Sequence, residues 1–349
     1  MNTTRSTFNG SLPPYTVVGG GKRLASTGIC AVLLGRGGRY VRNSCFKELQ
    51  NGGFDYVLSM ETPGERYDIE ELSGLFPFVR FIMFKDRANI GQQINIAAAE
   101  ADTPLFFVFW SDFHPVLSLD AERIVERLMS KPVETAEISA EEAAETSENR
   151  RPFVRLCTAP VIQNSRFETI PTAYLPVIDG RKFKTAPFVP VKEGEPTLYP
   201  FDASGVYDRA RFISLGGFDP KLDSAYWQLL DFGLRSWLWG EEIRCTQQIR
   251  FMPGGEVRAE DSTAGESYLR FFLKNLAPVI QTSDTPAAYL PLRRFLPYLM
   301  SAVVSPLKAL RDFIETRNWV ASNSRRFTRD VNAVSALWKT EPSASKAPK

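Results

Sequence analysis

The chain has 349 residues, 44% of them hydrophobic, with 25 Phe, 11 Tyr and 6 Trp. This composition excludes a disordered chain, and the length suffices for one large domain or two ordinary ones. A net charge of +2 gives no general reason to expect nucleic-acid binding, so no nucleic-acid partner is predicted. The single histidine, His114, excludes multi-histidine metal sites. The four cysteines are scattered and have neither metal nor redox spacing, which indicates reduced structural thiols.

Residues 1–27 are rich in Ser, Thr, Gly and Pro, and we expect them to form a flexible lead. Their GGGKR run is not a phosphate-binding loop, because Lys22 is followed by Arg23 where that motif has Ser or Thr. The N-terminal residues lack the apolar core of a signal peptide, so we expect the protein in the cytoplasm.

Four apolar runs then predict strands that are buried on both faces of a sheet. Helical patterns lie between them, and the one that starts at Asn89 has Gln92 in position to complete a capping box. Strands alternating with helices predict a doubly wound, mostly parallel sheet, which binds ligands beyond the carboxyl ends of its strands. Glu61 and Asp112 lie at such ends. The runs are GICAVLL (28–34), DYVLSME (55–61), FVRFIMF (78–84) and LFFVFW (105–110).

The second half of the chain begins with an acidic, solvated insertion at 131–150 that contains no aromatic residue. A strand is predicted at 153–162, followed by a Pro-rich irregular loop as far as residue 200. Segment 205–240 predicts a strand, a tight Gly-Gly turn and a helix that carries Asp231. Residues 340–349 have the composition of a disordered tail.

The order and spacing of these elements resemble the family-two glycosyltransferases, whose fold is the nucleotide-diphosphosugar transferase type called GT-A. The resemblance covers roughly residues 28–275 and rests on five pieces of sequence. It implies an enzyme that transfers a sugar from a nucleotide-diphosphate donor to a saccharide or lipid-linked acceptor, with inversion. The pieces are the strand and glycine loop from Ile29 to Gly38, the Asn89-x-Gly91 pair with Asn95 and Ala98 beyond it, the strand that ends in SDFHP, GVYDRARFISLGGFDPKL, and the helix LLDFGLRSWLWG.

The resemblance also implies a divalent metal, Mg or Mn, held by an Asp-x-Asp triplet at a strand end. In this chain the triplet is Trp110-Ser111-Asp112, so only its second acid remains. Asp112 and His114 are therefore the expected metal ligands. The alternatives are that Asp112 caps the turn before Pro115 and that His114 is an ordinary packed or exposed side chain.

Further positions are assigned to the donor by the same resemblance. Glu61, Asn89 and Gly91 are expected to contact the nucleotide, although Glu61 also fits an ordinary loop acid and the other two fit a helix start. Near the diphosphate we expect Arg270 and Lys274, four residues apart on one helix. Arg209 is expected there as well, because guanidinium groups bind phosphate oxygens well. Solvated surface positions are the alternative for all three basic residues.

The acidic residues that supply the catalytic base in the family are only partly present in this chain. The Glu-Asp pair that opens the last core helix falls on Gln228 and Leu229, so Asp231 is the candidate base. Its alternative is an ion pair with Arg235, one helical turn later. The missing acids leave a second function open, that of a catalytically inactive relative that binds a nucleotide sugar or acts as a scaffold. A dinucleotide-dependent enzyme is disfavoured, because no G-x-G-x-x-G follows the first strand.

Residues 276–339 predict a helical C-terminal extension. Its segment 286–315 combines apolar residues with basic ones, as in segments that lie in the surface of an anionic membrane. The uncharged stretch 295–307 is too short to span a bilayer. A helical pair packed on the domain is the alternative.

Overall fold

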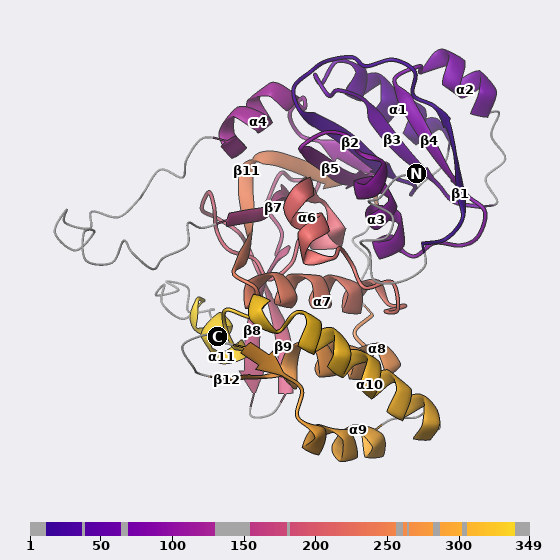
Figure 1. Cartoon of the computed structure of the whole chain (residues 1–349). Helices are drawn as coiled ribbons and strands as arrows, with labels where there is room; N and C mark the ends of the chain where they lie inside the picture. Colours follow the sequence, from indigo (N-terminus) through magenta and orange to yellow (C-terminus); the bar gives the residue numbers. More distant parts are fainter. Residues whose placement is uncertain are drawn as a thin grey trace.

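The computed structural model describes residues 12–36, 39–63, 69–129, 154–179, 182–255, 261–263, 265–281, 287–301 and 306–338. The predicted acidic insertion at 131–150 and the tail at 340–349 lie outside the described residues, as do residues 1–11 of the lead. In the described part, helices cover both faces of a central sheet and a helical C-terminal segment packs below it (Figure 1).

Over the described ranges, the sheet has nine strands in the order β1-β4-β3-β2-β5-β10-β7-β11-β6. Its strands β4, β3, β2 and β5 are parallel, as predicted, and β7 is parallel to β11. Between these groups β10 is antiparallel to both neighbours, while β1 and β6 are antiparallel at the two edges. The strands are β1 (Tyr15–Gly19), β2 (Ile29–Leu34), β3 (Val57–Glu61), β4 (Val79–Phe84), β5 (Leu105–Trp110), β6 (Phe113–Pro115), β7 (Val154–Ile162), β10 (Gly205–Asp208) and β11 (Glu241–Pro253).

Helices pack on both faces of this sheet, as doubly wound topology requires. On one face α4 lies beside the end of α1, where the Ala121 amide donates to the Gly52 carbonyl at 2.8 Å. On the other face α3, α6 and α7 contact one another. The helices are α1 (Arg39–Gln50), α2 (Ile69–Leu75), α3 (Ile90–Glu100), α4 (Ala121–Met129), α6 (Arg209–Leu215), α7 (Ala225–Leu238) and α8 (Glu266–Phe271).

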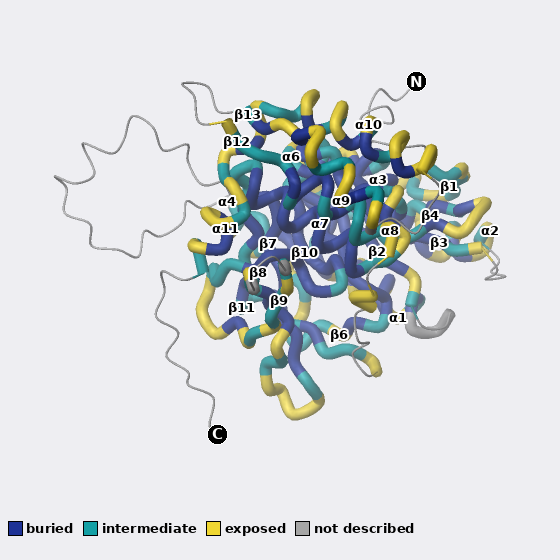
Figure 2. Tube along the Cα trace, turned by 90° about the horizontal axis from the view of Figure 1, so that it is seen from below, coloured by how far each residue is buried: buried dark blue, intermediate teal, exposed yellow. Residues whose placement is uncertain are grey.

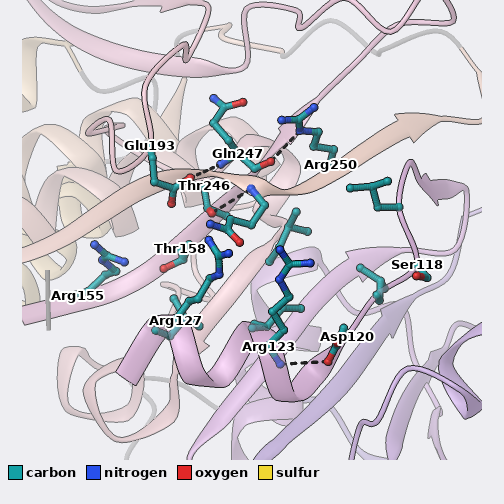
Figure 3. Close-up of a pocket in the computed structure, with 16 residues that line it drawn as sticks. Ser118, Asp120, Arg123, Arg127, Arg155, Thr158, Glu193, Thr246, Gln247 and Arg250 are labelled. Carbon is teal, nitrogen blue, oxygen red and sulfur yellow. Dashed lines mark hydrogen bonds between the residues drawn. The ribbon is translucent and has the colours of Figure 1, made fainter. Parts of the chain in front are cut away.

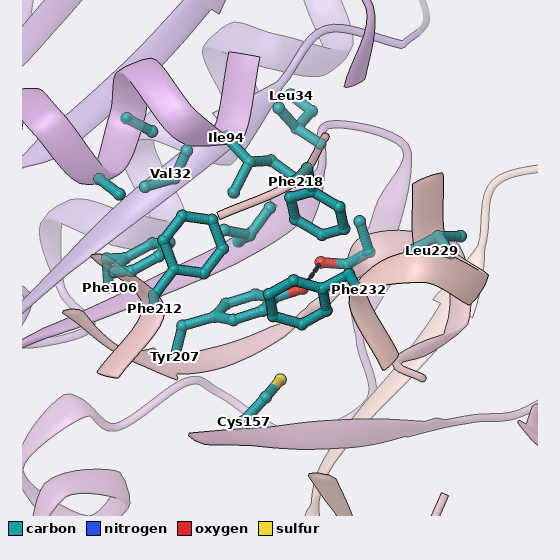
Figure 4. Packing of buried hydrophobic residues seen from close by; sticks show 14 of the residues in the cluster. Val32, Leu34, Ile94, Phe106, Cys157, Tyr207, Phe212, Phe218, Leu229 and Phe232 are labelled. Atoms are coloured by element: carbon teal, nitrogen blue, oxygen red, sulfur yellow. Dashed lines mark hydrogen bonds between the residues drawn. The ribbon is translucent and has the colours of Figure 1, made fainter. Parts of the chain in front are cut away.

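Aromatic side chains form the core between the sheet and helices α6 and α7 (Figure 4). The Phe106 ring stacks on Tyr207 with centroids 5.2 Å apart, and Phe218 stacks on Phe232 at 4.4 Å. The buried Tyr207 hydroxyl donates to the Ala203 carbonyl at 2.7 Å, so its polar atom is satisfied. Full burial of an aromatic side chain contributes about 2 kcal/mol, which fixes α6 and α7 firmly against β5 and β10.

The predicted start of α3 is confirmed in detail. The Asn89 side chain accepts from the Gln92 amide at 2.9 Å, and the Gln92 side chain accepts from the Asn89 amide at 3.0 Å. This reciprocal pair satisfies two amides that a helix start leaves without helical partners. It is the structural alternative that the sequence left open for Asn89.

Three elements differ from the sequence-based expectations. Part of the expected flexible lead forms β1, because Tyr15, Val17 and Val18 pair with the open edge of β4. The expected irregular loop contains a hairpin of β8 (Ala173–Asp179) and β9 (Lys182–Phe188), whose prolines are tolerated because both strands are sheet edges. The helix α6 precedes the Gly-Gly turn, where a strand leading directly into the turn was expected.

The C-terminal extension packs against the last core helix, which is the alternative that the sequence left open. Trp239, at the end of α7, stacks on Trp319 with centroids 5.8 Å apart and lies 5.9 Å from Phe327. Figure 1 shows α10 below α7, with α9 at the lower edge of the molecule. In the described part, no helix is long and apolar enough to cross a bilayer. The elements are β12 (Val279–Gln281), β13 (Ala287–Tyr289), α9 (Phe295–Ser301), α10 (Pro306–Ser322) and α11 (Val331–Ala336).

Candidate functional site

The parallel strands β2, β3 and β5 end at one edge of the sheet, where this topology binds ligands. We call the residues that follow or end these strands the rim: Arg36, Glu61, Trp110, Ser111 and Asp112. The loops after β2 and β5 are tied together there, because the Arg36 amide donates to the Ser111 hydroxyl at 2.9 Å. The same hydroxyl donates to the Arg36 carbonyl. These two hydrogen bonds hold the ends of β2 and β5 together.

Arg36 is held at the rim by an aromatic ring and a carboxylate. Its guanidinium carbon lies 3.7 Å from the centroid of the Trp110 ring, and its Nη1 lies 2.6 Å from the Asp202 carboxylate. The Trp110 indole in turn donates to the Asp202 carbonyl at 2.9 Å. Cation–π contact and an ion pair together fix a cation at the strand end, with about a fifth of the Arg36 side chain exposed.

Asp202 reaches the rim from the segment that leads into β10. Because β10 is antiparallel to β5 and Gly205 pairs with Val108, the residues before Gly205 lie beside the carboxyl end of β5. Asp202 has a φ of 49° and Ala203 a φ of 59°. Non-glycine residues in this left-handed region carry strain of about 1 kcal/mol or more, and such strain clusters at functional sites. The strained pair sets the position of a carboxylate that is about a fifth exposed.

The two expected metal ligands lie at the start of β6. Asp112 is half-buried and His114 is exposed. The Gly254 amide donates to the Asp112 carbonyl at 2.7 Å, and a Cβ at position 254 would lie 3.2 Å from His114 Nε2. Among the described residues, no group of three or more His, Cys, Asp or Glu side chains is arranged to hold a metal ion. The side chains present do not form a complete metal cage.

The residues expected around the nucleotide have mostly internal partners. Glu61 ends β3 as predicted, but it is buried, pairs with Arg42 of α1 and accepts from the Ser59 hydroxyl at 2.7 Å. Gly91 lies against Phe218 and helix α7, because a Cβ there would come within 2.7 Å of the Phe218 Cβ and 3.1 Å of the Gln228 side chain. Its amide also donates to the Gln228 side chain at 3.0 Å. Packing and hydrogen bonding within the domain therefore account for a glutamate at position 61 and a glycine at position 91.

Arg209 lies beside the beginning of β5, whereas Asp112 follows its end, so the structure does not bring Arg209 together with the rim. It follows Asp208, which pairs with Leu105 at the beginning of β5. Its Nε donates to the Ala98 carbonyl at 2.8 Å, which ties α6 to α3. A diphosphate bound at the rim would therefore lie away from Arg209.

Asp231, Arg270 and Lys274 do come together, in a network whose fourth member is Asp219. Lys274 Nζ lies 2.9 Å from both carboxylates, and Arg270 Nε lies 2.7 Å from Asp219. Asp231 also pairs with Arg235 at 3.0 Å and is fully buried. The ion pair that the sequence offered as an alternative to catalysis is thus present, and Asp231 has no exposed surface from which to meet an acceptor.

The charges in this network shift one another strongly. Burial alone would raise the pKa of Asp219, but Lys274 and Arg270 outweigh it and hold that pKa well below its usual value. The pKa of Asp231 is lowered as well, since Lys274 and Arg235 outweigh burial. The pKa of Lys274 is lowered by burial, against the opposing effect of the two carboxylates. Carboxylates with lowered pKa values and several donors are poor proton acceptors.

Two residues of the candidate site, Arg36 of the rim and its partner Asp202, were missed by the sequence reasoning. Arg36 follows the first buried strand directly, in a glycine-rich loop, which is a usable signal because such a position faces the ligand edge of a parallel sheet. Asp202 carries no comparable signal. Its place depends on how β10 pairs with β5 and on a backbone conformation that the residue type does not indicate.

Comparison with known structures defines the fold class. The chain is similar to the crystal structure of GalNAc-T7 with UDP, GalNAc and Mn2+, at 14% identity and a TM-score of 0.51, over 83% of this chain and 54% of that one. It thus spans about half of that protein's length. The fold is that of the GT-A glycosyltransferases, which confirms the predicted fold class. The narrower assignment to family two stays a resemblance, and no family model and no curated sequence matches the chain.

Two further solved structures are similar at lower scores. One is S. aureus TarS 1–349, at 12% identity over 84% of this chain and 72% of that one, with a TM-score of 0.41. The other is the mannosyltransferase PcManGT from Pyrobaculum calidifontis in complex with GDP-Man and Mn2+. It is 8% identical over 93% of this chain and 82% of that one, with a TM-score of 0.43.

Proposed function

We propose that the protein transfers a sugar from a nucleotide-diphosphate donor to a saccharide or lipid-linked acceptor, with the donor lying across the rim. One observation supports this most strongly. In a GT-A fold, a cation that Trp110 and Asp202 hold in place stands at the strand end where this topology binds its ligand. A guanidinium in that place suits the two charges of a diphosphate.

In the proposed reaction, Arg36 stabilises the charge that grows on the diphosphate as the bond to the sugar breaks. A divalent metal would supply the same charge when bound, and Asp112 and His114 are the ligands that we propose for it. Since the described residues form no three-ligand cluster, we base no step on a metal. Asp112 is then proposed as a hydrogen-bond acceptor for donor hydroxyls.

Asp202 is the proposed general base. An acceptor hydroxyl gives its proton to the Asp202 carboxylate while its oxygen attacks the anomeric carbon. The bond between that carbon and the diphosphate oxygen breaks, the nucleoside diphosphate leaves with the electron pair, and direct displacement inverts the configuration. Donor binding would draw Arg36 toward the diphosphate, which leaves the Asp202 carboxylate available to the acceptor.

A second candidate function is a donor-binding scaffold without turnover. It is favoured by helix α7, where the position of the usual acid pair is occupied by Gln228 and Leu229. Both side chains are buried, and Gln228 is engaged with Gly91 at 3.0 Å and with the Leu222 carbonyl at 2.7 Å. Neither can accept a proton from an acceptor hydroxyl.

Thermal unfolding with a panel of nucleotide sugars, with and without manganese, tests both functions. Stabilisation by one donor is expected from either function, because a ligand that binds only the folded state raises its stability. Release of nucleoside diphosphate that is lost in Asp202→Asn, with donor stabilisation kept, supports the enzyme. Stabilisation without turnover in the wild type supports the scaffold, and the absence of stabilisation by every donor contradicts both.

We also propose that the protein works at the surface of a membrane, on its cytoplasmic side. The support is an apolar face on the extension, where Met300 is 82% and Leu307 is 81% exposed, with Arg293 and Arg311 exposed nearby. Figure 2 shows exposed stretches along α10. Apolar side chains flanked by basic ones fit an anionic lipid surface. The face comprises Leu292, Leu296, Met300, Leu307, Leu310 and Ile314.

Sedimentation with vesicles of acidic lipid tests the membrane proposal. Met300→Glu and Leu307→Glu should each release the protein from the vesicles, because each puts a carboxylate into the apolar face. The matched control is Leu75→Glu, since Leu75 is 62% exposed on the distant helix α2. Equal sedimentation of all three variants, or none by the wild type, would contradict the proposal.

A further inference from the structure

A pocket of about 340 Å³ lies away from the rim, between α4, β7 and the middle of β11. Figure 3 shows Arg123 and Arg127 extending from α4 toward β11. Arg155 of β7 and Arg250 of β11 complete a set of four arginines in the lining. The remaining walls are partly aliphatic, with Leu117, Leu119, Ile124, Leu128 and Ile249.

An irregularity in β11 forms one wall of this pocket. Thr246 pairs with Pro160 and Arg250 with the next residue of β7, so residues 247–249 bulge out of the ladder. The bulge is supported from both sides: Arg250 Nε donates to the Gln247 carbonyl at 2.7 Å, and the Gln247 amide donates to Glu193 at 2.7 Å. Bulges of this kind redirect side chains and recur beside functional sites.

The arginines of this pocket outnumber its acids, and the acids are already engaged. Among the described residues, the lining contains two carboxylates, Asp120 and Glu193. Asp120 accepts from the Arg123 amide at 3.1 Å as a helix cap, and Glu193 accepts from the Gln247 amide. Glu193 and Glu242 are the acids that act on Arg155, and Glu242 is itself paired with Arg244 at 2.6 Å.

Arg155, like Arg250, is half-buried, whereas Arg123 and Arg127 are exposed. Burial lowers the pKa of Arg155 below the usual value, and the neighbouring Arg244 lowers it further, while Glu193 and Glu242 act in the opposite direction. Because the two neighbouring acids already bind the Gln247 amide and Arg244, the half-buried guanidinium of Arg155 would be stabilised by an added anion.

We propose that this pocket binds a saccharide or polyol that carries phosphate groups, at a site separate from the donor rim. The guanidinium groups bind the phosphate oxygens, and the aliphatic wall packs against the carbon face of the sugar or polyol. A volume near 340 Å³ accommodates a ligand of one or two such units. The phosphate chemistry is shared by a free sugar phosphate and by a phosphate-bearing acceptor chain.

The position of Arg250 in the pocket wall makes the site compatible with an acceptor chain, because the residues after Arg250 lead toward the rim. Residue 251, next in β11, pairs with Pro115, and Met252 pairs with His114 of the strand that follows Asp112. A chain bound in the pocket can therefore continue toward the rim along β6. The opposite end, at Arg155, lies near the start of β7.

Titration calorimetry at low salt tests the proposal with three probes: fructose 1,6-bisphosphate, a short glycerol-phosphate oligomer, and fructose without phosphate. Both phosphorylated probes should bind the wild type and fructose should not. Arg155→Gln should weaken binding at least about tenfold, and Arg123→Gln with Arg155→Gln should abolish it. Tighter binding of the oligomer indicates an acceptor chain, and tighter binding of the bisphosphate indicates a free sugar phosphate.

Two control variants isolate the pocket. Arg166→Gln removes one exposed positive charge elsewhere and should leave binding within about twofold. Arg36→Gln removes the rim cation and should also leave binding of the phosphorylated probes unchanged. Nucleotide-sugar binding, in contrast, should fail in Arg36→Gln and persist in Arg155→Gln. Failure of the phosphorylated probes to bind, or equal binding by Arg155→Gln and the wild type in a folded protein, would overturn the proposal without affecting the donor site.

Discussion

Lys274 Nζ lies 2.9 Å from the Asp231 carboxylate, and neither side chain has more than 3% of its surface exposed. The same ammonium lies 2.9 Å from Asp219, so one lysine joins helix α7 to the segment that follows the Gly-Gly turn. Two buried carboxylates that share a lysine between them are stable only as a fully paired set. We therefore expect Asp231 to contribute to the free energy of unfolding of the domain.

Asp231→Asn should therefore lower the free energy of unfolding by about 3 kcal/mol, because it leaves part of the positive charge of Lys274 and Arg235 buried without its partner. Urea unfolding measures this directly. Asp223→Asn is the matched control, since Asp223 is exposed just before α7, and it should change stability by less than about 0.5 kcal/mol. A wild-type unfolding curve for Asp231→Asn would show that the pair contributes nothing to stability.

Acid should destabilise the wild type through the same network. The folded-state pKa of Asp219 is lower than its ordinary value of 3.8, because Lys274 and Arg270 outweigh burial. Its contribution to stability is then complete above pH 3.8 and is lost as the pH falls below that value. Unfolding free energies at pH 5, 4 and 3 should fall more steeply in the wild type than in Asp219→Asn. If the unfolding free energies of the two proteins fell equally with pH, the network would not be the cause of the acid destabilisation.

Glu241 should give the opposite pH dependence. Burial raises its pKa to about 7, with Asp208 and Glu242 acting in the same direction and Arg211, 3.6 Å away, opposing them. A raised pKa means that the folded protein binds the proton more tightly, so stability falls as the pH rises from about 4.5 to 7. Glu241→Gln should exceed the wild type in stability at pH 8 by at most about 3 kcal/mol, and not at pH 4. The same difference at both pH values would contradict this.

Trp110→Asp should make donor binding depend on metal. The substitution completes the Asp-x-Asp triplet with Asp112 and removes the ring on which Arg36 rests at 3.7 Å. Calorimetry should then show stronger nucleotide-sugar binding with manganese than without it. Trp110→Phe is the control, since it keeps a ring under Arg36 and adds no carboxylate. Equal responses of the two variants to manganese would count against the proposed exchange of metal for guanidinium.

The sequence predicted the parallel half of the fold well, because its signals there are local. Four apolar runs matched β2 to β5, and the Asn89 capping box was confirmed bond by bond. The antiparallel additions were harder to predict. β1 and the β8–β9 hairpin depend on pairing partners far along the chain, and in the hairpin this pairing overcomes the weak strand preference of proline.

The candidate site could be predicted only in part. The rim followed from topology, and the gap in the Asp-x-Asp triplet was visible at Trp110. The pairing of Lys274 with Asp219 and Asp231 could not be read from spacing, since it depends on three segments that meet only in the folded domain. For the same reason Arg209 was assigned to a diphosphate, although it lies at the end of the central strands opposite to the rim.

A crystal structure with the best-binding nucleotide sugar tests the central claim most directly. We predict the diphosphate within hydrogen-bond distance of the Arg36 guanidinium, with the sugar between Asp112 and Asp202. A donor bound away from these three side chains, or an Arg36 that stays paired only with Asp202 while the diphosphate lies elsewhere, would contradict the account.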